Sequence, residues 1–529
     1  MITNNTKETN IKTIQNPILP GFNPDPCMIR VNDMYYIAVS SFEWLPGVRI
    51  YQSDNLADWE FCTDVLTDQV NLKGNPKNCS IWAPQISYHE GLYYLMYTDV
   101  KSTKRPFKDT HNYLITSQSI TGPWSEPIYL NSSGFDPSLY HDDDGRKWLL
   151  NCLWDYRITE GNKSSGIVIQ EYDPEQQRLI GEPIKLFDCT PLKKTEAPHI
   201  YKRNGYYYLI TAEGGTGSGH AVTVARSTEL LGPYEVDPQY PMLTSSDNPE
   251  LELQCAGHGS LVETPEGEWY MAHLCTRPVE GKYPILGRET ALQQVYWDSE
   301  GWLRLTSGGH SPQTEVPLPK GAVVRGKRST DFYDDFTGAG LRPEWNTLRI
   351  VADDQWCNLS ERPGYLRIHA GESAQSLFEH HILAVRQADT HFRAETELDY
   401  EPAMYLQMAG LMLYLNEDNY WFAYVTREKE QGKVLRLMRC EKEEFTLEPV
   451  IVKLEEGKPL QLAVDISGVN GQFYYRTEEG EWNELGEAHH VGFLSGGFTG
   501  NFVGIAAHDM NQFMGSYADF SYFRYTGRK

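Results

Sequence analysis

Residues 23–41 read NPDPCMIRVNDMYYIAVSS, in which an acidic residue lies between prolines and two β-type runs flank a short polar turn. Proline fixes its own φ and keeps the preceding residue out of the helical region, so Asp25 is held in an extended segment. The turn Asn32-Asp33 between the two runs predicts a β-hairpin. This stretch decides the fold because the same pattern returns four more times: APQISYHEGLYYLMYT from Ala83, DPSLYHDDDGRKWLLNC from Asp136, EAPHIYKRNGYYYLITAEG from Glu196 and GHGSLVETPEGEWYMAHL from Gly257.

The repeats follow one another at regular distances. With Pro26, Pro84, Pro137, Pro198 and Ser260 as markers, the spacings are 58, 53, 61 and 62 residues. Each later repeat again holds a predicted hairpin turn, at Glu90-Gly91, Asp144-Gly145, Asn204-Gly205 and Glu266-Gly267. Units of this length suit four-stranded blades, and five blades around a channel form a propeller. We therefore predict an all-β chain with a five-bladed β-propeller over residues 16–315.

The rest of the chain has a different pattern. Residues 1–15 form a predicted N-terminal extension, and the Pro-rich, basic residues 316–330 form a predicted linker. From residue 331 to 529, short alternating runs such as YLRIHA and LQLAVDIS are separated by charged turns. This pattern predicts a second domain, a β-sandwich.

Composition limits the classes of partner. The formal charge of −25 argues against nucleic acid, because phosphate neutralisation supplies much of the affinity there, and favours a small neutral ligand. We find no signal peptide and no run of about 20 apolar residues, so we expect a cytoplasmic protein without a membrane partner. The nine cysteines include no C-x-x-C pair, which fits reduced thiols.

Three repeats begin with a carboxylate, at Asp25, Asp136 and Glu196. The first residues of propeller repeats are expected to lie near the central axis, so these three side chains should converge on one pocket. A pocket with several carboxylates and aromatic walls suits glycosidic bond cleavage, which needs one protonated acid for the leaving oxygen and one ionised base for water.

Over nearly its whole length the sequence resembles glycoside hydrolase family 43, in particular the β-xylosidase branch with a C-terminal sandwich, and this resemblance implies that the sandwich is concanavalin-like. Several motifs in the same order carry the resemblance: GFNPDP, FEWLPGVRIYQSDNLADWE, IWAPQI, GFDPSLY, TEAPHIYKRNGYYYL, AGHGSLVET and LGRET. The resemblance implies that Asp25 is the general base and Glu196 the general acid. It implies that Asp136 orients the acid and raises its pKa. An inverting reaction would place acid and base about 6.5–9.5 Å apart.

The resemblance also implies which residues hold the sugar. It places Phe42, Trp82 and Phe135 against the sugar ring, Arg288 on its hydroxyls and His258 at the channel. For the three aromatic residues and for His258, a purely structural place in the core is the alternative. The segment GGFTGNFVGIAAHD resembles the part of the sandwich that closes the pocket, with Phe502 as the predicted residue and Phe498 as the alternative.

These implications predict an exo-acting, inverting β-xylosidase that releases xylose from non-reducing ends of β-1,4-xylo-oligosaccharides. The alternatives are α-L-arabinofuranosidase activity, alone or as a second activity, a retaining glycosidase, and a sugar-binding propeller without catalysis. No cofactor is expected, although Asp335 and Asp519 are candidates for a structural calcium ion. Family resemblance also makes us expect a homo-oligomer.

Overall fold

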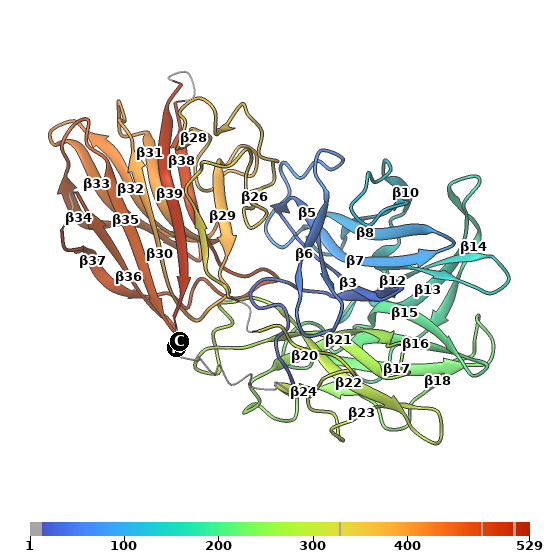
Figure 1. Cartoon of the computed structure of the whole chain (residues 1–529). Helices are drawn as coiled ribbons and strands as arrows, with labels where there is room; N and C mark the ends of the chain where they lie inside the picture. The colour runs from blue at the N-terminus through green and yellow to red at the C-terminus, as the bar shows by residue number, and fades with distance from the viewer. Residues whose placement is uncertain (1–12, 327–328, 478–479, 512–514, 529) are drawn as a thin grey trace, which may run out of the picture.

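The computed structural model describes residues 13–326, 329–477, 480–511 and 515–528. Every regular element in these residues is a β-strand, and none of them forms a helix long and apolar enough to span a membrane. The strands gather in two bodies that lie side by side (Figure 1), one built from the first part of the chain and the other from the last. The predicted all-β fold of a propeller followed by a sandwich is confirmed.

The first body contains five antiparallel sheets that follow one another along the chain. The first sheet consists of β2 (Cys27–Val31), β3 (Met34–Val39), β5 (Gly47–Ser53) and β6 (Glu60–Leu66). The second consists of β7 (Ser80–His89), β8 (Leu92–Ser102), β9 (Asp109–Ser117) and β10 (Ile128–Asn131). The third consists of β11 (Gly134–His141), β12 (Lys147–Trp154), β13 (Ser164–Asp173) and β14 (Arg178–Phe187).

The last two sheets of this body complete the ring. The fourth consists of β15 (Glu196–Arg203), β16 (Tyr206–Glu213), β17 (Ala221–Ser227), β18 (Glu235–Val236) and β19 (Leu243–Thr244). The fifth consists of β20 (Gln254–Glu263), β21 (Trp269–Thr276), β22 (Glu289–Trp297) and β23 (Leu303–Leu305). Strand β2 lies against both β7 and β20, and β11 lies against β7 and β15, so the first strands of the sheets surround a common axis.

The five predicted hairpin turns are confirmed. Two-residue turns at 32–33, 90–91 and 204–205 join the first two strands of the first, second and fourth sheets. In the third and fifth sheets the predicted turns lie inside five-residue loops, 142–146 and 264–268.

Each first strand has the same backbone irregularity where it meets the axis. Asp25, Ala83, Asp136, Ala197 and His258 all have positive φ, between 21° and 55°. In the second to fifth sheets the pairing with the next strand shifts register at this point, as in a β-bulge. In the first sheet the Ser40 amide donates to the Pro24 carbonyl at 3.1 Å, next to the regular pair Cys27 and Ala38.

This register corrects one sequence-based expectation. Ala197, and not Glu196, is the residue equivalent to Asp25 and Asp136. Glu196 lies one residue earlier, at the position that Trp82 and Phe135 occupy in their sheets. The sequence pattern could not reveal this offset, because the bulge places two neighbouring residues of the strand near the axis. The same alignment gives Gly259, rather than Ser260, as the marker of the fifth repeat.

The second body packs two sheets face to face around one apolar core. The larger sheet consists of β25 (Phe332–Asp334), β27 (Cys357–Asn358), β28 (Leu366–His369), β30 (His391–Asp399), β35 (Leu460–Ser467), β36 (Asn470–Arg476), β37 (Asn483–His490) and β39 (Tyr517–Gly527). The other consists of β29 (Ile382–Arg386), β31 (Gln407–Asn416), β32 (Asn419–Glu428), β33 (Gly432–Glu441), β34 (Glu444–Lys453) and β38 (Phe502–Asp509). Alternating burial along β30 matches the alternating sequence pattern.

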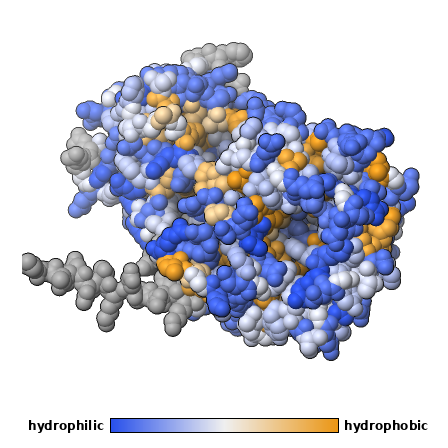
Figure 2. All heavy atoms as spheres, turned by 45° about the vertical axis from the view of Figure 1, so that its right-hand side comes forward, coloured by the Kyte–Doolittle hydropathy of each residue, from blue (hydrophilic) through white to orange (hydrophobic). Residues whose placement is uncertain are grey.

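The two bodies share a continuous apolar interface. Strand β4 (Trp44–Leu45) of the first body pairs with β26 (Thr347–Leu348) of the second. Near the predicted N-terminal extension and linker, β1 (Thr13–Gln15) pairs with β24 (Glu315–Pro317), while residues 1–12 and 327–328 lie outside the described part of the chain. On the face in Figure 2, hydrophobic residues form small separate patches in a mainly hydrophilic surface.

Candidate active site

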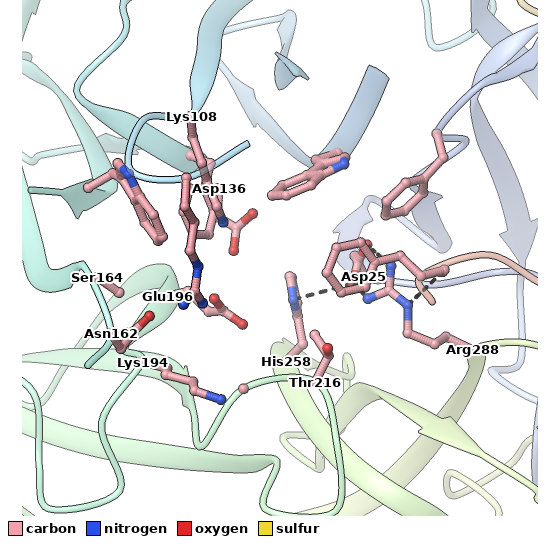
Figure 3. Close-up of a pocket in the computed structure, with 17 residues that line it drawn as sticks. Asp25, Lys108, Asp136, Asn162, Ser164, Lys194, Glu196, Thr216, His258 and Arg288 are labelled. Carbon is pink, nitrogen blue, oxygen red and sulfur yellow. Dashed lines mark hydrogen bonds and ion pairs between the residues drawn. The ribbon is translucent and has the colours of Figure 1, made fainter. Parts of the chain in front are cut away.

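A cavity of about 200 Å³ lies where the first strands of the five sheets meet. It is smaller than the roughly 300–1,000 Å³ of sites for drug-sized ligands, which suits a small ligand. The structure brings eight of the nine predicted site residues together around it: Asp25, Phe42, Trp82, Phe135, Asp136, Glu196, His258 and Arg288. In Figure 3, Asp25 and Arg288 lie on one side, and Asp136 and Glu196 on the other.

Asp25 is surrounded by groups that favour its charged form. Arg288 donates from Nη1 to Oδ1 at 2.7 Å and from Nη2 to Oδ2 at 3.2 Å, and the Ser40 hydroxyl donates to Oδ2 at 2.7 Å. His258 Nδ1 lies 3.7 Å from Oδ1. Burial by itself raises the pKa of Asp25, but these neighbours outweigh it and lower that pKa below the ordinary value of 3.8. Asp25 is therefore ionised at neutral pH.

Glu196 and Asp136 have the opposite environment. Burial raises the pKa of Glu196 to about 7; the charge of Asp25 adds to this effect, whereas Lys108 opposes it. Burial and the charge of Glu196 raise the pKa of Asp136 well above its ordinary value. Because two neighbouring carboxyl groups resist ionising together, the pair retains a proton near neutral pH. The pocket therefore holds an ionised carboxylate facing a protonated one.

Aromatic rings form the wall between the two sides. Trp82 lies 5.5 Å from Phe135 and 6.0 Å from Phe42, between ring centres. Phe498, from the sandwich, lies 5.5 Å from Trp82 and 6.0 Å from Phe42, and it lines the same cavity. Such faces pack against the apolar faces of sugar rings, so this wall suits a carbohydrate.

The position of Phe498 is fixed from the propeller side. Its amide donates to Asn78 Oδ1 at 2.7 Å, and its carbonyl accepts from Arg288 Nε at 2.9 Å. Asn78 also accepts through its carbonyl from Trp82 Nε1 at 3.1 Å. The second body therefore completes the pocket of the first.

The prediction that Phe502 closes the pocket is wrong, and the alternative, Phe498, lines it. Phe502 is fully buried and stacks on Trp44 with ring centres 3.8 Å apart. Its other aromatic neighbour is Phe22, at 5.9 Å. Phe502 begins strand β38, whereas Phe498 lies in the loop before it, and this difference places Phe502 in the interface and Phe498 at the cavity.

Comparison with known proteins agrees with this geometry. Residues 14–303 match Glycosyl hydrolases family 43, and residues 333–526 match the Beta xylosidase C-terminal Concanavalin A-like domain. The chain belongs to glycoside hydrolase family 43. It is therefore an enzyme that cleaves glycosidic bonds.

Relatives in family 43 extend over nearly the whole chain. A protein named beta-xylosidase from Bacillus subtilis is 43% identical over 97% of this chain and 99% of its own length. Xylosidase/arabinosidase 43B from Humicola insolens is also 43% identical, over 97% of both chains. The crystal structure of xylan beta-1,4-xylosidase from Bacillus halodurans superposes with a TM-score of 0.94 at 48% identity, covering 97% of this chain and all of the other.

Sequence reasoning missed several residues that line the family 43 pocket. Three of them are cations, and the most buried of the three is Lys108, which comes from the loop between β8 and β9. Its Nζ lies 4.3 Å from the ring centres of both Phe135 and Trp154. Burial lowers the pKa of Lys108, and the charges of Glu196 and Asp136 oppose that shift. Loop residues of this kind follow no repeat, so no pattern could single them out. The others are Arg105, Trp154, Asn162, Ser164, Lys194, Gly215 and Thr216.

Two of these residues belong to a glycine-rich segment of the chain. The glycine-rich stretch 213–220 contains Gly215 and Thr216, and it lacks the lysine and helix of a phosphate-binding loop. Its two lining residues place this stretch as a loop beside the pocket.

The calcium ion suggested for Asp335 and Asp519 stays a prediction from the sequence, and other groups of the protein contact both side chains. Asp519 accepts from Arg367 Nε at 2.7 Å and from Arg362 Nη1 at 2.9 Å, so its charge is already neutralised. Asp335 accepts from the hydroxyl and the amide of Thr337. Among the described residues no group of three or more His, Cys, Asp or Glu side chains is arranged to hold a metal ion.

Proposed function

We propose that the protein is an inverting, exo-acting β-xylosidase that releases xylose from the non-reducing ends of β-1,4-xylo-oligosaccharides. One observation carries the proposal: the pKa of Asp25 is lowered and that of Glu196 is raised to about 7 across one sugar-sized cavity. Pairs of carboxyl groups with separated pKa values are the pattern of general base and general acid. The names of the relatives supply the sugar, xylose.

In this mechanism Asp25 accepts the proton of the attacking water. Arg288 and Ser40 hold both of its oxygens, so the carboxylate keeps one orientation and stays ionised. Glu196 donates its proton to the leaving oxygen, and Asp136 keeps that proton available by repelling a second negative charge. A single displacement by water inverts the anomeric carbon, so the released sugar is α-xylose.

The aromatic wall that Phe498 completes supports cleavage at the ends of the substrate chain. Phe42 and Phe498 both lie beside Arg288, the partner of Asp25. Figure 3 shows Lys194 and Asn162 on the opposite side of the pocket, which is left for the rest of the substrate. A single sugar at the terminal subsite then fits the cavity better than a chain that passes through it.

The decisive experiment follows xylobiose hydrolysis by NMR, with Asp25→Asn as the inactive control. The expected result is α-xylose as the first product with wild type and a rate at least about a hundredfold lower with the variant. Initial release of β-xylose would instead indicate a retaining enzyme, which needs its carboxyl groups about 5–5.5 Å apart.

A second activity, that of an α-L-arabinofuranosidase, has one observation in its favour. One relative of 43% identity is named xylosidase/arabinosidase. The test is the rate on 4-nitrophenyl α-L-arabinofuranoside beside that on 4-nitrophenyl β-D-xylopyranoside. Loss of both rates in the Asp25→Asn variant would assign both activities to one site.

The cytoplasmic location and the homo-oligomer stay predictions from the sequence.

A further inference from the structure

Two cations at the pocket form no ion pair within the described residues, although the charge of Lys194 acts on Glu196 and lowers its pKa. Arg105 and Lys194 line the cavity, and both side chains are exposed. Within the part of the chain that the structure describes, neither side chain forms an ion pair or a hydrogen bond. By contrast, Arg288 in the same pocket is bound to Asp25.

Both cations lie on the side of the pocket that receives the leaving group. Lys194 lies two residues before Glu196, and Figure 3 shows it on the side of Asn162, away from Asp25 and Arg288. Arg105 lies three residues before Lys108, whose ammonium group lies beside Trp154. The acid must contact the leaving oxygen, so residues around it face the second sugar and not the first.

The side chains that line the pocket carry more positive than negative charge. The lining holds four basic side chains, Arg105, Lys108, Lys194 and Arg288, and three carboxyl groups, Asp25, Asp136 and Glu196. Arg288 neutralises Asp25. The pair Asp136 and Glu196 retains one proton, and Lys108 faces its remaining charge. His258 is neutral, because burial lowers its pKa. The lining therefore carries a net excess of two positive charges, and Lys194 and Lys108 share the influence of the remaining carboxylate charge.

The surplus makes the mouth of the pocket locally positive. The charge of Arg105 repels that of Lys108 and contributes to the lowered pKa of Lys108. The chain as a whole carries a formal charge of −25, so a local positive region contrasts with the rest of the protein. A mouth of one sign of charge attracts ligands of the opposite sign.

We propose that Arg105 and Lys194 bind a carboxylate on the leaving-group side, so that the enzyme prefers xylo-oligosaccharides whose second residue carries a uronic acid. The inference rests on the proposed function and adds to it the class of substrate. The terminal xylose still enters the neutral pocket beside Asp25, and the acidic substituent stays at the exposed mouth, where no desolvation of its charge is needed.

The test compares an acidic oligosaccharide with the neutral compound made from it by reduction. The substrate is a xylotetraose with glucuronic acid on the second residue from the non-reducing end, and the neutral partner is the same compound after reduction of its carboxyl group to the alcohol. The readout is the ratio of kcat/KM for the acidic and the neutral compound. A change in the pKa of Glu196 affects both compounds, so it cancels in this ratio.

The chain offers a matched control for each substitution. Lys104 and Lys193 are exposed neighbours of Arg105 and Lys194 that do not line the cavity. Lys193 and Lys194 have similar positive φ, 61° and 56°, so a glutamate at either position meets the same backbone strain. The double variants to compare are Arg105→Glu/Lys194→Glu and Lys104→Glu/Lys193→Glu.

We expect wild type to prefer the acidic compound, and the ratio to fall by about tenfold in Arg105→Glu/Lys194→Glu at low salt. The control variant should change the ratio by less than about twofold, and added salt should reduce the preference of wild type. An equal fall in both double variants, or an unchanged ratio in the first, would overturn the inference. A wild type that cleaves neither compound nor xylobiose would overturn the proposed function itself.

Discussion

Arg288 holds Asp25 with two hydrogen bonds and, through its Nε, donates to the carbonyl of Phe498. One guanidinium group therefore joins the proposed base to the sandwich. Arg288 lowers the pKa of Asp25, while burial alone would raise it.

Replacement of Arg288 by methionine should consequently move the acid limb of the pH profile. Without the guanidinium, the pKa of Asp25 rises, and the base becomes ionised only at higher pH. The expected result is an acid limb of kcat/KM that is displaced upward. The basic limb should move upward by less, because the charge of Arg288 also lowers the pKa of Glu196, but less than that of Lys108 does. An acid limb at the wild-type position would show that Asp25 is not the group that this limb reports.

Glu196→Gln should separate substrates by their leaving groups. Xylobiose needs protonation of its leaving oxygen, whereas 4-nitrophenolate leaves without it. We expect kcat on xylobiose to fall by about 10²–10⁴-fold and kcat on the aryl xyloside to fall much less. Equal losses on both substrates would argue against Glu196 as the acid.

The basic limb should respond in opposite directions to two substitutions in the same pocket. The enzyme is active while Glu196, with a pKa of about 7, is protonated, so activity falls as the pH rises through that value. Asp136→Asn removes a negative neighbour, which lowers the pKa of Glu196 and moves the limb to lower pH. Lys108→Met removes a positive neighbour and should move the limb to higher pH.

The measurement is the pH dependence of kcat/KM for both variants beside wild type. Because the two variants change opposite charges, a general disturbance of the pocket predicts shifts of the same sign. Shifts of the same sign, or none, would contradict the assignment of this limb to Glu196.

Phe498→Ala should mainly affect the kinetics of the enzyme, whereas Phe502→Ala should mainly lower its stability. Phe498 is partly exposed at the cavity, so its removal should raise KM or lower kcat while changing the melting temperature little. Phe502 is fully buried against Trp44, and its removal should cost about 3–5 kcal/mol of stability. Thermal unfolding and xylobiose kinetics on both variants check this. A large loss of stability in Phe498→Ala would contradict its place at the cavity.

Much of the site could be predicted because the repeats are visible in the sequence. Proline markers and hairpin turns identified the first strands, and Asp25 and Asp136 follow directly from them. The structure adds the one-residue offset of Glu196, which depends on a bulge that the residue types do not specify. Lys108 and Lys194 come from loops, where neither periodicity nor repeat spacing applies. Phe498 and Phe502 are four residues apart, and only the start of strand β38 decides which of them is buried.

The irregular backbone at the head of each first strand has a consequence for how this scaffold can change. It gives every sheet two adjacent positions next to the axis, and in each sheet at least one of them reaches the cavity: Asp25, Trp82, Phe135 with Asp136, Glu196 and His258. The backbone conformation is therefore the same in all five sheets, whereas the side chains at these positions differ. Substitution of the side chains at these positions could therefore introduce a new reaction without a change in the backbone that carries them.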